Sequence, residues 1–161
     1  MMRPLIICAL TLALLPSCST YTFNLKGKSD IASLAVERFE NETDQYELTD
    51  RMTDIVIDAF IADGNMKVLP RENADAILYG TLRSYTRAPS DYDENDEVLS
   101  YSVSMVFDVA LKKRGEEADM WHEVLTEQGF FTVADETEQD GQQEAINLLV
   151  QEIINKTTKS W

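Results

Sequence analysis

The segment from Leu99 to Lys112 alternates between apolar and polar positions, and no other feature of the chain constrains its fold as strongly. One set of alternate positions is wholly apolar and holds Leu99, Tyr101, Val103, Met105, Phe107, Val109 and Leu111. The other set is mainly polar and holds Ser100, Ser102, Ser104, Val106, Asp108, Ala110 and Lys112. Because successive side chains of a strand point to opposite faces, this pattern predicts one long strand with a buried face. A solvated second face is typical of an antiparallel sheet.

Two other segments repeat their apolar residues with helical spacing. The first, over 48–63, has apolar residues at Leu48, Met52, Ile55, Val56, Ala59 and Phe60. The second, over about 139–157, has them at Ile146, Leu149, Val150, Ile153 and Ile154. Spacings of three and four residues predict two amphipathic helices. Gly64 follows the first, at the position where helices favour a left-handed residue.

Shorter patterns predict the remaining strands over 31–39, 67–69, 75–87 and 120–133. A turn over 40–44 and a polar hairpin loop over 88–97 connect them. Gly129 is typical of a bulge inside the last strand, and we expect Trp161 to pack near the sheet edge. The order predicts an α+β fold, in which two amphipathic helices pack on one face of a mainly antiparallel sheet of about four strands.

The N-terminal residues are typical of an export signal. Arg3 precedes an apolar run of about eleven residues, which is shorter than the roughly 20 that span a bilayer. Cys18 follows a Leu-x-Ser sequence that resembles the lipobox of bacterial lipoproteins, although Pro16 is unusual there. The resemblance implies acylation of Cys18, and stable anchoring takes two lipid chains. Ordinary cleavage near Ser17, which leaves a soluble protein, is the alternative.

We therefore expect a signal peptide over 1–17, a lipidated tether over 18–30 and a single domain over 31–161. Ser19 stands where an Asp tends to retain lipoproteins at the inner membrane, so the resemblance implies sorting to the outer membrane. Cys8 lies inside the signal, which leaves Cys18 as the mature chain's one cysteine and excludes an internal disulfide. The formal net charge of −15 argues against nucleic acid and against electrostatic docking on anionic lipid.

The residues that could carry chemistry do not form a known catalytic or metal-binding pattern. His122 is the one histidine, lies within a predicted strand and has no Gly-x-Ser-x-Gly sequence to accompany it, so we expect a structural or surface role. Asp91, Asp93 and Asn95 have the spacing of the first calcium ligands of an EF-hand, but Asp96 replaces its glycine. A solvated hairpin tip is favoured there, with a weak divalent-cation site as the alternative. We expect no enzyme activity, no catalytic residue, no structural metal and no cofactor.

Arg83 and Arg87 are two positive charges in a chain that has few of them. They are four residues apart on one predicted strand, so their side chains would lie on the same face, about 13 Å from each other. They could grip separated phosphates, or pair with nearby carboxylates, which is the favoured interpretation.

The order of several short segments resembles the lipopolysaccharide-assembly lipoproteins, the LptE family. Ile31–Thr43 is similar to the family's opening strand, and Glu47-Leu48-Thr49 leads a helix that ends at Asp63-Gly64. The later matching pieces are Ala74–Leu82, Arg87-Ala88-Pro89, Tyr92-Asp93, Val98, Tyr101, Met120-Trp121 and the terminal Trp161. The resemblance covers nearly the whole mature chain and implies two helices packed on a four-stranded sheet.

The resemblance also implies a function without catalysis. Family members fill the lumen of the outer-membrane barrel LptD, help it assemble and assist passage of lipopolysaccharide to the cell surface. Such a protein would be lipid-anchored on the periplasmic side of the outer membrane. Direct binding of lipopolysaccharide in the family relies on basic residues, for which Arg83 and Arg87 are the best candidates here.

Two other classes share parts of this pattern. The opening strand, the Phe-x-Asn-x-Thr sequence and the helix are also similar to lipoproteins that regulate peptidoglycan synthases and to curli-secretion lipoproteins. These bind other periplasmic proteins. The long strand followed by Trp121 and Trp161 favours the lipopolysaccharide-assembly family, and a hydrolase is the third alternative.

Overall fold

The alternating segment forms β5, Val98–Lys113, at the centre of the sheet. The computed structural model describes residues 31–159, so Cys18, the expected signal and tether, and Trp161 lie outside the described residues. On the predicted buried face, the apolar side chains from Val103 to Leu111 are wholly buried. Strands β4, Ala76–Tyr92, and β6, Asp119–Thr132, pair antiparallel with β5 on its two sides. The prediction for this part of the sheet is confirmed.

The N-terminal part of the sheet is parallel, which corrects the sequence prediction. Six strands form one mixed sheet, ordered β3-β1-β4-β5-β6, and β2 also pairs with β4. The short strands are β1, Ser33–Val36, β2, Glu40–Asn41, and β3, Lys67–Val68. Both β1 and β2 run parallel to β4, and β1 runs parallel to β3. A helix between β2 and β3 returns the chain to its starting end, and such a crossover makes the flanking strands parallel.

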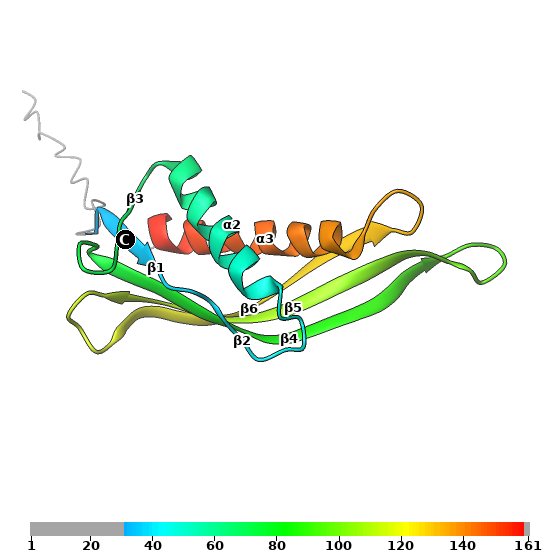
Figure 1. The fold of residues 1–161 in the computed structure, drawn as a ribbon, viewed down its shortest axis with the longest axis horizontal. Helices are drawn as coiled ribbons and strands as arrows, with labels where there is room; N and C mark the ends of the chain where they lie inside the picture. Colours follow the sequence, from blue (N-terminus) through cyan, green and yellow to red (C-terminus); the bar gives the residue numbers. More distant parts are fainter. Residues whose placement is uncertain (1–30, 160–161) are drawn as a thin grey trace, which may run out of the picture.

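Two helices cover one face of the sheet (Figure 1), as predicted. Helix α2 runs from Leu48 to Asp63 and ends at Gly64, which has a φ of 70°. Helix α3, Glu138–Lys159, begins after Thr137, whose backbone N–H donates to the Asp140 carboxylate at 2.8 Å. That contact satisfies a donor next to the helix N-terminus. The side chains on the inner faces of both helices are wholly buried and belong to the hydrophobic core: Met52, Val56, Phe60, Ile146, Leu149 and Ile153.

Strand β4 extends further than predicted, and this creates a projecting hairpin. It continues through Pro89 to Tyr92, so the loop before β5 is limited to 93–97. Beyond Leu82, β4 pairs with β5 alone. Proline is tolerated on a strand with one free edge because its missing N–H removes no pairing there. The tip of this hairpin extends past the N-terminal end of α3 (Figure 1).

Gly129 does not mark a bulge, so that prediction is wrong. Gly129 pairs in regular register with Val103 on β5. The glycine is needed because α3 crosses β6 closely at this point. A Cβ atom at Gly129 would collide with the Gly141 carbonyl oxygen and lie 2.9 Å from the Ala145 nitrogen.

Candidate functional site

Arg83 and Arg87 lie on opposite faces of the sheet, which corrects the prediction that they share one. A register shift between Leu82 and Ser84 leaves Arg83 without a cross-strand partner. A bulge of this kind inserts one residue and exchanges the faces that the following side chains occupy. Leu82 pairs with buried Phe107, and beyond the shift Arg87 pairs with buried Val103. Arg87 is therefore on the helix side and Arg83 on the uncovered side.

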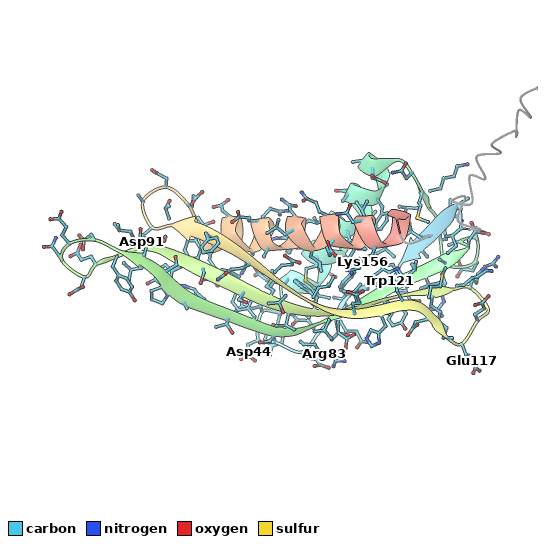
Figure 2. The ribbon with its side chains drawn as sticks, turned by 180° about the vertical axis from the view of Figure 1, so that it is seen from behind. Asp44, Arg83, Asp91, Glu117, Trp121 and Lys156 are labelled. Atoms are coloured by element: carbon cyan, nitrogen blue, oxygen red, sulfur yellow. The ribbon has the colours of Figure 1, made fainter. Side chains whose placement is uncertain are left out.

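Arg83 is the centre of an ion-pair cluster on the uncovered side of the sheet (Figure 2). Its Nη1 donates to Glu42 Oε1 at 2.5 Å, and its Nη2 donates to Asp108 Oδ2 at 2.9 Å. His122 on β6 contacts the second oxygen of Asp108. The Arg83 guanidinium, and after it the His122 ring, hold the pKa of the Asp108 carboxyl below its usual range. His122 is thus an exposed strand residue with a carboxylate partner, as expected.

Arg87 instead joins the hairpin to the N-terminal turn of α3. Its Nη1 donates to Glu138 Oε2 at 3.0 Å, and its guanidinium carbon lies 4.2 Å from the Tyr101 ring centroid. Tyr85 also donates to Glu138, and burial together with this carboxylate raises the pKa of Tyr85 to about 12. Both arginines therefore pair with carboxylates, the interpretation that the sequence favours.

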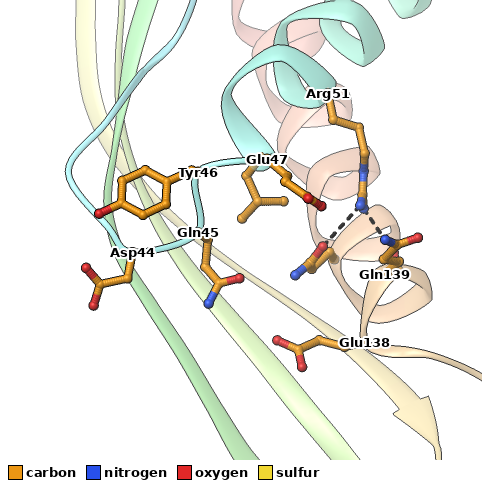
Figure 3. A pocket seen from close by; sticks show the side chains of 9 residues that line it. Asp44, Gln45, Tyr46, Glu47, Arg51, Glu138 and Gln139 are labelled. Carbon is orange, nitrogen blue, oxygen red and sulfur yellow. Dashed lines mark hydrogen bonds between the residues drawn. The ribbon is translucent and has the colours of Figure 1, made fainter.

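A cleft of about 570 Å³ lies between the 44–48 segment and the start of α3 (Figure 3). Arg51 reaches across it, donating to Gln142 Oε1 at 3.1 Å and to the Gln139 carbonyl at 3.0 Å. Asp44, Glu47 and Glu138 also line the cleft. Its walls combine one guanidinium with carboxylates, amides and the Tyr46 side chain, so the cleft is suited to binding a polar group. Its residues were not singled out from the sequence, because the topology alone brings them together.

The acidic hairpin tip uses its first carboxylate to form its own turn. The backbone N–H groups of Asn95 and Glu97 each donate to Asp93 Oδ1 at 2.8 Å. The hydrogen bond from Glu97 N–H has the largest effect, and together with that from Asn95 N–H it holds the pKa of Asp93 below its usual range. Among residues 31–159, no group of three His, Cys, Asp or Glu side chains could hold a metal ion.

The surface that sequence reasoning missed is on the side of the sheet away from the helices. Within the described residues, α2 and α3 contact the sheet from one side (Figure 1). On the other side, cross-strand partners of β4, β5 and β6 form three successive rows that hold no charged side chain, and the next row is charged because Asp91 pairs with Ser100. We name these three rows the uncharged face, which comprises Ser84, Val106 and Thr126; Thr86, Ser104 and Gln128; and Ala88, Ser102 and Phe130. The run of serines was visible in the sequence, but the bulge hid which β4 residues join them.

A family model assigns the chain. The model for LptE, described as lipopolysaccharide-assembly, matches residues 31–157. The chain belongs to the LptE family. This is a family of non-enzymatic envelope lipoproteins that take part in lipopolysaccharide assembly, so the predictions of the family and of no enzyme activity are confirmed. No curated protein matches the chain.

Solved structures share the fold of this LptE-family chain at low sequence identity. The hypothetical protein CT253 from Chlamydia trachomatis is 9% identical, with a TM-score of 0.56 over 77% of this chain and 96% of its own. A PelC dodecamer from Paraburkholderia phytofirmans is 15% identical, with a TM-score of 0.52 over 79% and 86%. A minor lipoprotein from Acinetobacter baumannii is 14% identical, with a TM-score of 0.51 over 80% and 94%. These likenesses show the fold alone. Neither α2 nor α3 has the length and hydropathy that a membrane-spanning helix requires, and no other helix occurs among residues 31–159.

Proposed function

We propose that this chain is an outer-membrane lipoprotein that fills the lumen of the LptD β-barrel and helps it assemble, so that lipopolysaccharide reaches the cell surface. The family match over residues 31–157 carries this proposal. It covers the whole described domain apart from its last two residues, so the domain as a unit takes the family's role.

The architecture supports a scaffolding role. A single hydrophobic core joins the sheet to both helices, and the long strands β4 and β5 pair over almost their whole length. Side chains in such a core are close-packed and deform little. A wide barrel has a polar interior that another element can plug. A stiff body with a polar surface is suited to that task.

Anchoring through Cys18 is part of the same proposal. A lipid on Cys18 would hold the domain at the membrane surface by the tether over 18–30. Each buried CH₂ contributes about 0.8 kcal/mol, so an acylated residue with two or more chains stays attached. A domain without catalytic groups depends on being held beside its partner.

Contact of lipopolysaccharide with Arg83 and Arg87 stays a prediction. The structure makes it a prediction of two separate contact sites, one on each face of the sheet. Because the arginines lie on opposite faces, each would meet a different phosphate group, and each would first have to leave its carboxylate partners. We expect Arg83→Glu and Arg87→Glu each to weaken binding of purified lipopolysaccharide severalfold while barrel recovery stays unchanged. Lys67→Glu, at another exposed strand position, is the control. Equal binding by all variants in a pull-down on immobilised lipopolysaccharide would remove the prediction.

The experiment that tests the function is partner recovery. The full-length chain with a C-terminal affinity tag is extracted from membranes in mild detergent and purified, and its partners are identified by mass spectrometry. We expect a large outer-membrane β-barrel in near-equal amount. Recovery of a peptidoglycan synthase or a secretion-complex protein in its place would overturn the proposal and favour the alternative class.

A further inference from the structure

The uncharged face stands out because the rest of this chain is so strongly charged. The sequence carries 29 acidic and 14 basic residues, yet three successive rows across three strands hold hydroxyl, amide and apolar side chains only. Charged groups border the face at both ends. The Arg83–Asp108–His122 cluster closes one end, and the acidic tip from Asp91 to Glu97 closes the other.

The helix side of the molecule has the opposite character. Both helices carry exposed acidic residues: Asp50, Asp54, Asp58, Asp63 and Asp140. Charge of one sign keeps a surface hydrated and repels other acidic surfaces. Depletion of charge, in contrast, is the compositional mark of the centre of a protein interface. The two sides of the sheet are therefore fitted to different surroundings.

Exposed apolar side chains lie at or just beyond the two ends of the face. Phe130 is 49% exposed on β6 at one end of it, and Val124, just beyond the other end, is 63% exposed. Between them, the small side chains of β5 leave the centre flat, and Ser102 is nearly buried by its neighbours. A flat centre with apolar groups at its ends can dehydrate against another surface at low cost.

The area of the face indicates which kind of partner can bind it. Three rows at ~6.8 Å and three strands at ~4.8 Å give about 300 Å². This is less than half of the ~800 Å² that each partner buries in a standard interface. A second copy stacked on this face alone would bury too little for a stable dimer. A concave wall that curves past the free edges of β4 and β6 would bury more.

We propose that the uncharged face is the surface that seats on the inner wall of the barrel, while the acidic helix side is turned toward water. The inference rests on the proposed function and names the contacting surface. The matching wall is a concave sheet whose lumen-facing side chains are hydroxyls and amides, the polar chemistry that barrel interiors present. A charge placed on the face would then be buried without a partner, which costs far more than the same charge in water.

The test introduces acidic residues on either side of the molecule in the full-length, lipidated, tagged chain. The face variant is Thr86→Glu with Thr126→Glu, two exposed positions on the outer strands of the face. The matched control is Asn147→Glu with Gln151→Glu, two exposed positions on α3. We expect the face variant to recover at least tenfold less barrel than wild type, and the control variant to recover it fully. Thermal unfolding of each purified chain reports whether the fold is retained.

A second measurement keeps the inference testable if the face variant unfolds. A photo-crosslinking amino acid replaces Gln128 on the face or Gln151 on α3, both exposed glutamines. We expect a barrel-sized adduct from position 128 and a much weaker one from position 151. A barrel adduct from position 151 alone, or full barrel recovery by a folded face variant, would overturn the inference and leave the proposed function standing. An adduct of the chain with itself at position 128 would assign the face to self-association. Failure of the wild type to recover any barrel would overturn the proposed function first.

Discussion

Two glycines show how a single missing side chain sets the distance between a helix and a strand. Gly129 on β6 and Gly141 on α3 face each other, and a Cβ atom on either would meet atoms of the other element. A glycine inside a strand can mark a bulge or a site where another backbone approaches closely. The sequence pattern alone favoured a bulge at Gly129. Only the position of α3, set by residues far along the chain, distinguishes close approach from a bulge.

Substitution of the strand glycine should therefore be severe. We expect Gly129→Ala to lower the free energy of unfolding by about 3 kcal/mol or more, because the new Cβ would meet backbone atoms that cannot rotate away. Gly141→Ala should cost less, since its closest neighbour is the Phe131 side chain at 3.0 Å and alanine favours a helix. Urea unfolding would measure both, with Gln128→Ala as the control. Equal midpoints for Gly129→Ala and the control would contradict this account.

Asp75 fastens β1 to β4 through one carboxylate oxygen. Asp75 Oδ2 accepts hydrogen bonds from the Ser33 hydroxyl at 2.7 Å and from the Ala32 and Ser33 backbone N–H groups at 3.0 Å. The Ser33 hydroxyl, followed by the Ala32 N–H, holds the pKa of Asp75 below its usual range. Because the folded-state pKa lies below the unfolded value, this contribution to stability is present above about pH 4 and is lost as the pH falls further.

Asp75→Asn should reveal that dependence. At pH 7, we expect the variant to unfold at a lower urea concentration than wild type, because the amide accepts hydrogen bonds less strongly than the carboxylate. The difference should shrink as the pH falls to about 3, where wild type loses the same charge. Asp58→Asn, on the exposed side of α2, is the control. A difference that stays constant from pH 7 to pH 3 would show that the charge of Asp75 does not matter.

At the scale of elements, periodicity predicted the parts of the fold that have one buried face. The apolar stripes of α2, α3 and β5 are buried over most of their length as expected, but Leu99, at the end of β5 in the projecting hairpin, is 47% exposed, which corrects its predicted burial. The sequence did not reveal the register shift at Arg83, because a bulge keeps the residue types and changes only their faces. It also did not reveal the parallel pairing of β1 and β2, which depends on where α2 returns the chain. The cleft and the uncharged face were missed for the same reasons.

The stripe of α3 gives a sharp test of its packing. Leu149 is wholly buried, whereas its neighbour Leu148 is 39% exposed. We expect Leu149→Ala to lower the free energy of unfolding by about 2–5 kcal/mol, through lost burial and the cavity it leaves. Leu148→Ala should change it by less than about 1 kcal/mol. Chemical denaturation of both variants would measure this pair, and a larger loss at Leu148 would refute the orientation of α3.

One edge of the sheet is protected by α3 and the segment before it. The backbone N–H groups of Phe130 and Thr132 donate to the carboxylates of Glu144 and Glu136, each at 2.7 Å. Unpaired strand N–H groups otherwise invite pairing with another chain. At this end of β6, two carboxylates take the place of a further strand.

At the scale of the whole molecule, anchoring and folding should be separable. The core lies within residues 31–153, so we expect Cys18→Ala to fold normally while it loses its attachment to the membrane. Fractionation should move the variant from the membrane to the soluble periplasmic fraction, and acyl labelling should disappear. Its thermal midpoint should equal that of the detergent-extracted wild type within about 2 °C. An unlabelled, soluble wild type would show that Cys18 is not lipidated.

The parallel placement of β1 has a consequence for the order in which the chain folds. Strands β4, β5 and β6 follow one another closely and can pair as soon as they meet. In contrast, Val36 of β1 pairs with Leu78, 42 residues later. Contacts between distant residues form slowly, because a long loop must first close. In a chain synthesised from its N-terminus, β1 is made first and must wait for β4, so the domain cannot close before β4 has also been made.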